Sequence, residues 1–148
     1  MEVSRIDIKR PMQHEPSRVW EVLSDLERQT TWMKDAEEIK FVSDQQRGTG
    51  TKMEVLTVVG PFRTNDIIEV TDWVEGSHID VIHIGLVKGT GRLAVARADG
   101  GGAVVSWTEE TRFPWWLGGP ITGFVAKPIL KSVWKANLAR LEAAVSGP

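Results

Sequence analysis

The feature that most restricts the fold is a helical pattern near the C-terminus. From Leu130 onward, apolar residues recur with the 3.6-residue period of an α-helix, while Lys131, Lys135 and Glu142 fall on the opposite face. The apolar face consists of Leu130, Val133, Trp134, Leu138, Leu141, Ala144 and Val145. A helix with one apolar face must bury it against another element, so the rest of the chain has to supply an apolar surface.

The start of this helix is less regular. Gly119 and Pro120 suit an N-cap and a first helical position, whereas Pro128 removes a backbone hydrogen bond and disfavours helix at Lys127. The apolar face before Pro128 points in a different direction from the later one and contains Ile121, Phe124, Val125 and Pro128. We therefore expect a kink, or a short helix leading into a long one. We also expect the first part of this helix to contact apolar material on a second side, which could be the core, a cavity or lipid.

The segment between Glu38 and Phe113 has the pattern of strands separated by turns. Strands are predicted near Ile39–Ser43, Thr51–Val59, Arg63–Trp73, His78–Leu86, Arg92–Ala98 and Val104–Phe113. Turn chemistry lies between them, at Gly60-Pro61 and at Lys88-Gly89-Thr90-Gly91 among other places. Their short, regular spacing predicts an antiparallel meander.

The N-terminal part adds a strand and two helices. A strand is predicted at Val3–Lys9, a helix at Pro16–Leu26 and a short second helix around Thr30–Lys34. An antiparallel sheet followed by one amphipathic helix buries that helix on its concave face. The predicted fold class is therefore α+β.

Composition narrows the functional classes. The 148 residues are expected to form a single domain, 1–148. Lys and Arg number 18 and Asp and Glu number 20, which gives no basic footprint for nucleic acid. The absence of cysteine excludes disulfides and thiolate metal sites. Neither a transmembrane run nor a signal peptide is recognisable, so we expect a soluble, cytoplasmic protein. No pattern indicates an oligomeric state.

Several short motifs occur in an order typical of one superfamily. They are Pro16-Ser17-Arg18-Val19-Trp20 with Val22-Leu23, Asp25-Leu26-Glu27-Arg28, Trp32-Met33, Gly48 and Gly50 before a strand, Val70–Trp73 with Glu75, and Gly102–Trp107. With the apolar C-terminal helix, they make the chain resemble the START-like, or SRPBCC, superfamily over essentially its whole length. The most similar branch is labelled polyketide cyclase/dehydrase and lipid transport. Gln29-Thr30 and His14-Glu15 depart from the usual family pattern, which bears on the packing of the first helices.

The resemblance implies a helix-grip fold. In that fold a seven-stranded antiparallel sheet wraps around a long C-terminal helix, two short helices follow the first strand, and an internal cavity holds hydrophobic small molecules. The superfamily includes both carriers and enzymes, so the activity has to be argued from the site.

The last predicted strand contains the first candidate for chemistry. Its two-residue period places Val105, Trp107, Glu109, Thr111 and Phe113 on one face, opposite a fully polar face. The mixed face should point inward and bring Glu109 with it. A buried carboxylate needs a hydrogen-bond partner or a raised pKa, so Glu109 is an acid/base or an anchor for a polar ligand group. The alternative is a position at the open rim or a structural pair with an arginine.

His83 is the second candidate. Both faces of its strand are partly apolar, so the pattern leaves its direction open. If it points inward it is a general base near neutral pH, and otherwise it is a core or surface histidine. Thr111 completes the predicted catalytic group. His14 and His78 are expected in a loop or at a strand end, and the spacing of the three histidines is poor evidence for zinc. We expect neither a metal nor a cofactor.

Aromatic residues before the long helix suggest a cavity mouth. Trp115 and Trp116 could gate the cavity, pack in the core, or form an edge that binds a protein. With a stripe of Lys127, Lys131 and Lys135, a peripheral membrane contact is a further alternative. The predicted ligand contacts are Trp32, Met53, Phe62, Ile68, Trp107, Phe113, Trp115, Trp116, Phe124, Ile129 and Val133.

Three functions fit these observations. The favoured interpretation is a carrier or sequestering protein for a lipid-like or polyketide-like molecule, because apolar residues dominate and no catalytic motif is evident. The second is a cofactor-independent cyclase or dehydratase that uses Glu109 with His83 or Thr111 for proton transfer. The third is a protein-interaction module that uses the Trp115-Trp116 edge.

Overall fold

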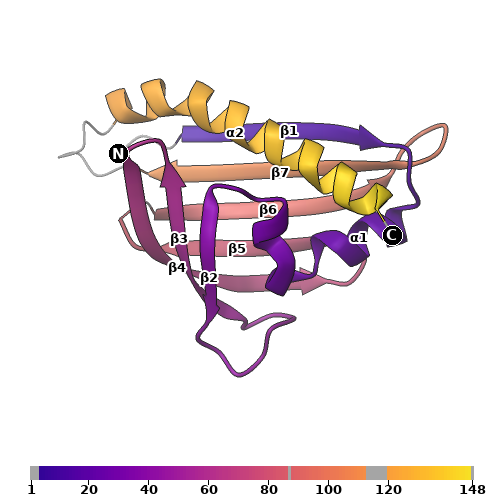
Figure 1. The fold of residues 1–148 in the computed structure, drawn as a ribbon, viewed down its shortest axis with the longest axis horizontal. Coiled ribbons are helices and arrows are strands. Elements are labelled where there is room, and N and C mark those ends of the chain that lie inside the picture. Colours follow the sequence, from indigo (N-terminus) through magenta and orange to yellow (C-terminus); the bar gives the residue numbers. More distant parts are fainter. Residues whose placement is uncertain (1–3, 87, 113–119, 148) are drawn as a thin grey trace.

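The computed structural model describes residues 4–86, 88–112 and 120–147, with the backbone alone described over 120–126. These residues form seven strands, two α-helices and a 3₁₀ helix, which follow one another in the predicted order (Figure 1). They are β1 (Ser4–Met12), α1 (Pro16–Leu23), η1 (Leu26–Thr31, 3₁₀), β2 (Ala36–Phe41), β3 (Lys52–Val59), β4 (Phe62–Val74), β5 (His78–Ile84), β6 (Lys88–Arg97), β7 (Ala103–Arg112) and α2 (Pro120–Ser146).

All seven strands belong to one antiparallel sheet. Their order is β1-β7-β6-β5-β4-β3-β2, so the first strand pairs with the last. The sheet curves, and α2, α1 and η1 lie on the same side of it (Figure 1). The predicted helix-grip architecture is therefore confirmed.

The stretch from Lys88 to Gly91 was predicted as a turn, and this is wrong. It forms the first part of β6, in which Gly89 pairs with both His83 and Thr111, and Gly91 pairs with Val81 and Glu109. Glycine commonly marks a turn, but here it occurs where a strand lies against neighbouring atoms at very short range. The β5–β6 connection consequently lies just before Lys88.

Two boundaries near the N-terminus also differ from the prediction. β1 continues beyond Lys9 to Met12, because its pairing with β7 extends to the Met12–Ala103 pair. The first helix ends at Leu23, and the second helical segment is a 3₁₀ helix that begins at Leu26. Pairing and packing with distant segments decide where these elements begin and end, so a local sequence pattern cannot predict their boundaries.

The C-terminal half of α2 packs into the core as its apolar face predicted. Leu138, Leu141 and Val145 are buried, while Lys131 and Lys135 are exposed. Glu142, predicted on the exposed face, is instead half-buried and forms a 2.7 Å ion pair with Arg10 of β1. The helix runs unbroken through Pro128, so a separate short helix is not observed. Among the described residues, no helix is long and apolar enough to span a membrane.

Candidate functional site

A cavity of about 650 Å³ lies between the concave face of the sheet and α2. Apolar side chains dominate its lining, which comes from η1, all strands from β2 to β7, α2, the loop before β2 and the turn between β3 and β4. Phe62 and Ile129 belong to the lining but are 41% and 52% exposed, so they mark where the cavity meets solvent. This volume lies within the usual range of small-molecule sites.

The predicted ligand contacts divide into three groups. Five of them line the cavity: Met53, Phe62, Ile68, Trp107 and Ile129. Trp32 and Val133 do not belong to the lining. Trp32 is 1% exposed and packs edge-on against Trp107, and Val133 packs against the core. The side chains of Phe113, Trp115, Trp116 and Phe124 lie outside the described residues, and the predicted gate and protein-binding edge lie there with them.

The three candidate catalytic residues all line the cavity. Burial alternates strictly along β7, which turns Glu109 and Thr111 inward. His83 of β5 also points inward, and its Nε2 lies 2.9 Å from Oε2 of Glu109. The indole N–H of Trp107 donates to Oε1 of Glu109 at 3.1 Å. Glu109 is only 7% exposed, so these two contacts provide the partners that a buried carboxylate needs.

The contact between His83 and Glu109 crosses a whole strand. β6 lies between β5 and β7, and at this point it contributes two glycines, Gly89 and Gly91, of which Gly91 lines the cavity. A Cβ atom on Gly91 would lie 2.6 Å from Oε1 of Glu109, closer than any normal contact. Any larger residue at position 91 would therefore displace the carboxylate from its present place beside His83.

His83 has a perturbed pKa. Burial would lower the pKa of its imidazole, but the charge of Glu109, the hydrogen bond to Glu109 and the charge of Asp66 together raise the pKa above its ordinary value. The pair is therefore biased toward an imidazolium beside a carboxylate. Such a pair can donate a proton to a ligand, accept one from it, or hold a polar group by hydrogen bonds.

Asp35 is a lining residue that the sequence analysis missed. It is buried before β2, where its Oδ2 accepts a hydrogen bond from the indole of Trp134 at 3.2 Å and its Oδ1 accepts one from Asn137 at 2.6 Å. Trp134 also stacks on Trp107, with ring centroids 4.9 Å apart. The two stacked indoles thus donate to different buried carboxylates: Trp134 donates to Asp35 and Trp107 donates to Glu109. Asp35 occupies a loop, so no periodic pattern could have pointed to it.

Asp66 was missed although a signal was present. The two-residue period of its strand places Asp66 on the same face as Ile68 and Val70, and all three line the cavity. One oxygen of Asp66 accepts a hydrogen bond from the backbone N–H of Leu86 at 2.9 Å. An acidic residue on an otherwise apolar strand face is the feature that identified Glu109, and it applies equally to Asp66.

A second polar cluster lies away from the cavity. Asp72, His78 and Asp80 bring their ligand atoms within 4.8 Å of one another. The Asp80 carboxylate accepts two hydrogen bonds from Arg92, at 2.6 and 2.8 Å, and His78 contacts Asp72 at 2.9 Å. These contacts lower the pKa of Asp80, chiefly through the hydrogen bond from Arg92. The arrangement is therefore a charge network rather than an open set of metal ligands.

Comparison with known proteins identifies relatives. The family model described as "Polyketide cyclase / dehydrase and lipid transport" matches residues 5–146. No curated protein sequence matches the chain.

Among solved structures, the protein TTHA0849 from Thermus thermophilus is 19% identical, with a TM-score of 0.77 over 95% of this chain and 96% of that one. The Zhui aromatase/cyclase from a Streptomyces species is 15% identical, with a TM-score of 0.74 over 98% and 94%. Norcoclaurine synthase from Thalictrum flavum, in complex with dopamine and hydroxybenzaldehyde, is 16% identical, with a TM-score of 0.72 over 97% and 87%. At these identities the likeness concerns the fold.

Proposed function

The chain belongs to the polyketide cyclase/dehydrase and lipid transport family, and we propose that it binds one small, largely apolar molecule and carries it unchanged. The observation that carries this proposal is the cavity itself, about 650 Å³ with a mainly apolar lining. Burying a ligand's apolar surface there supplies affinity, at roughly 25 cal/mol per Å² before the costs of binding. A few polar groups then fix its orientation.

Glu109 and His83 are the proposed anchor. Their 2.9 Å contact and the indole N–H of Trp107 hold both side chains in place before a ligand arrives. A preorganised anchor loses little side-chain entropy on binding. A hydroxyl or amine on the ligand can donate to Glu109, which leaves its apolar part against residues such as Met53 and Ile68.

A second candidate function rests on the same pair. A carboxylate beside an imidazole, in a mainly apolar cavity, is also an arrangement for proton transfer. In a cofactor-independent cyclase or dehydratase, one member would remove a proton from the substrate while the other returned one, and the Thr111 hydroxyl would position the reacting group. Thr111 is buried beside them and lines the cavity.

Turnover separates the two functions. Mass spectrometry of the purified protein identifies any bound species, which is then incubated with wild type and with Glu109→Gln. A carrier returns the compound unchanged, and the variant loses affinity by about 1–3 kcal/mol through the unmatched polar group. An enzyme converts the compound or its precursor, and the variant loses about 10²–10⁴ in rate.

Glu110→Gln is the matched control, because Glu110 is the next residue of β7 and binds Arg5 on the other face of the sheet. It removes the same charge without altering the cavity. Conversion by wild type and by Glu110→Gln, lost in Glu109→Gln, would contradict the carrier function and establish the enzyme.

A further inference from the structure

The polar part of the cavity lining is strongly acidic. Three carboxylates line the cavity, those of Asp35, Asp66 and Glu109, and His83 is the single inward-facing group that can carry a positive charge among the described lining residues. Arg92 also belongs to the lining, but its guanidinium binds Asp80 on the opposite face of the sheet. Among the described lining residues, acidic groups therefore outnumber the inward-facing groups that can carry a positive charge.

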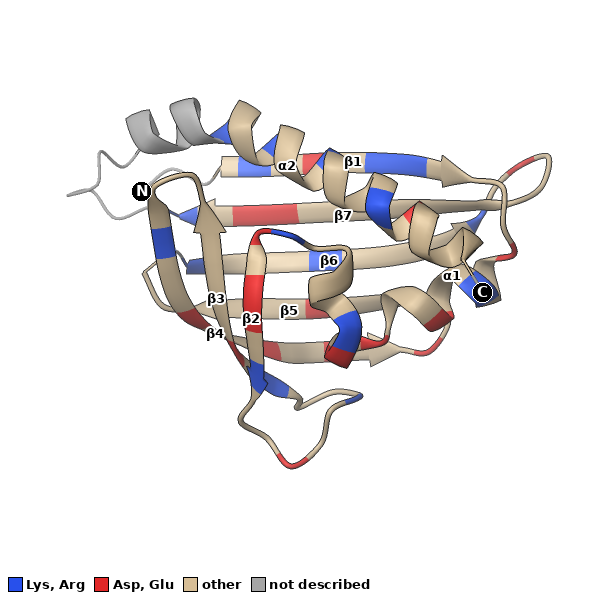
Figure 2. Cartoon of the chain, in the orientation of Figure 1, with Lys and Arg blue, Asp and Glu red and all other residues tan. Residues whose placement is uncertain are grey.

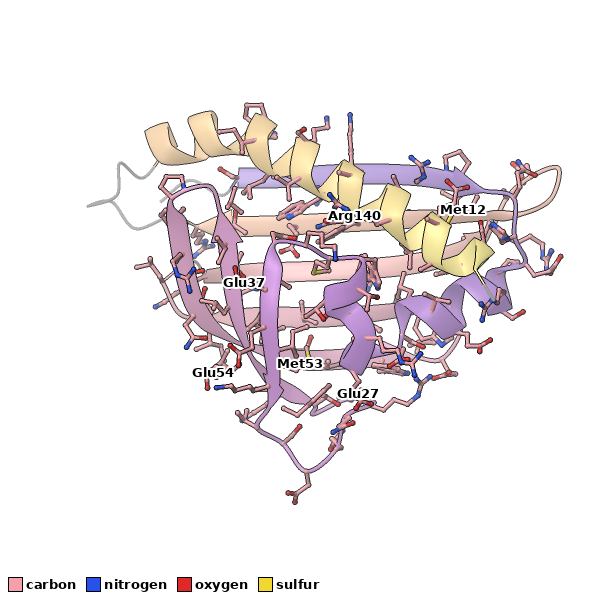
Figure 3. The ribbon with its side chains drawn as sticks, viewed as in Figure 1. Met12, Glu27, Glu37, Met53, Glu54 and Arg140 are labelled. Atoms are coloured by element: carbon pink, nitrogen blue, oxygen red, sulfur yellow. The ribbon has the colours of Figure 1, made fainter. Side chains whose placement is uncertain are left out.

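Asp35 and Asp66 are the two lining carboxylates that do not contact His83, and no basic side chain of the protein neutralises them. Within the described residues, no Lys or Arg forms an ion pair with Asp35 or Asp66, and the undescribed stretches contain no Lys, Arg or His. The guanidinium of Arg140 (Figure 3) approaches Asp35 only through Asn137, whose Oδ1 it contacts at 2.9 Å. Basic and acidic positions both occur on the strands and on α2 (Figure 2), so the excess of acidic groups is a property of the cavity lining and not of the whole sheet.

Neutral donors hold all three carboxylates in place. Asp35 accepts from Trp134 and Asn137, Asp66 from the Leu86 backbone, and Glu109 from Trp107 in addition to His83. These bonds orient the carboxylates without cancelling their charge. Ionised carboxylates accept hydrogen bonds and cannot donate them, so among the described lining residues His83 alone offers a cationic donor to an anionic ligand.

On the basis of the proposed function, we infer that the cavity selects a hydrophobic molecule whose polar group is cationic or donates hydrogen bonds, above all an amine, and rejects carboxylates of the same length. A ligand ammonium supplies the positive charge that Asp35, Asp66 and Glu109 lack. A ligand carboxylate meets like charge in a site of low dielectric, where repulsion is stronger than in water.

Three probes that differ in one group test this inference. Decylamine, decanol and decanoate share an apolar chain and are cationic, neutral and anionic at neutral pH. Their dissociation constants for the full chain are measured by isothermal titration calorimetry below their micelle concentrations. We expect decylamine to bind most tightly, and decanoate at least tenfold more weakly than decanol, which corresponds to about 1.4 kcal/mol.

Asp66→Asn shows whether the selectivity comes from the cavity. It keeps an oxygen for the Leu86 N–H and removes one lining charge, so the ratio of amine to acid affinity should fall at least threefold. Glu110→Gln removes a charge on the outer face and should leave the ratio unchanged. Decanoate binding as tightly as decanol, or an unchanged ratio in Asp66→Asn, would overturn the charge selectivity while leaving the carrier function intact. Binding of none of the probes would overturn both.

Discussion

The two ends of the concave face use the same elements for different purposes. At one end, Met12, Leu23, Val105, Leu138 and Leu141 are all almost fully buried and fill the space between sheet and helix. At the other end, the space is the cavity, and Phe62 and Ile129 remain substantially exposed at its rim. Met12 and Met53, labelled in Figure 3, belong to the filled end and to the cavity lining respectively.

Single elements pass through both ends. β7 contributes Val105 to the filled end and Glu109 to the cavity, and α2 contributes Leu141 and Ile129 in the same way. This contrast implies that the filled end provides the stability that offsets the unfilled volume and buried charge of the open end. Mutations should therefore affect folding at one end and binding at the other.

The largest expected effect is at the filled end. Leu141→Ala should lower the free energy of unfolding by about 2–5 kcal/mol, because the side chain is fully buried and a cavity would remain. Ile129→Ala, a matched truncation on the same helix, should cost less than about 1 kcal/mol because Ile129 is half-exposed. Urea unfolding measures both. Equal losses would show that the two ends do not differ as described.

The next effect concerns the glycine that makes room for Glu109. Gly91→Ala should destabilise the protein by about 1–3 kcal/mol through overpacking, since the added Cβ would approach Oε1 of Glu109 to 2.6 Å. It should also weaken ligand binding by separating Glu109 from His83. Thr90→Ala at the neighbouring position of the strand is the control for both measurements. Unchanged binding in Gly91→Ala would mean that the pair does not depend on the glycine.

A smaller effect is the titration of His83. Nuclear magnetic resonance should show a pKa of His83 above its ordinary value in wild type, lowered in Glu109→Gln because the charge and hydrogen bond of Glu109 raise it. Glu110→Gln should leave it in place. A pKa of His83 that is the same in wild type and in Glu109→Gln would show that the contact is not maintained in solution.

The same pKa makes stability depend on pH with a definite sign. Because the pKa of His83 is raised in the folded state, its stabilising contribution is complete below the unfolded-state pKa and is lost as pH rises through the folded-state pKa. Urea unfolding from about pH 6 to about pH 9, a window that starts near the ordinary pKa of histidine, should therefore show a loss of stability in wild type that is smaller in His83→Gln. Parallel pH profiles would contradict this.

The order of the elements, and the buried faces of β7 and of the later part of α2, could be predicted from the sequence alone. The 3.6-residue period located the buried face of α2 at Leu138 and Leu141, and the two-residue period turned Glu109 inward on β7. These properties depend on neighbours a few residues apart, so a single sequence contains them. The two-residue period of β4 could also have identified Asp66 as an inward-facing residue. The short motifs indicated the family and, through it, the fold.

Which polar groups meet in the cavity depends on the tertiary structure. His83 reaches Glu109 because β5, β6 and β7 pair in a register that places Gly91 opposite Glu109 and Gly89 opposite His83. Asp35 joins the cavity because α2 brings Trp134 and Asn137 to a loop about a hundred residues earlier in the chain. Register and helix placement result from the packing of all the elements together, and no local pattern of residues encodes either one.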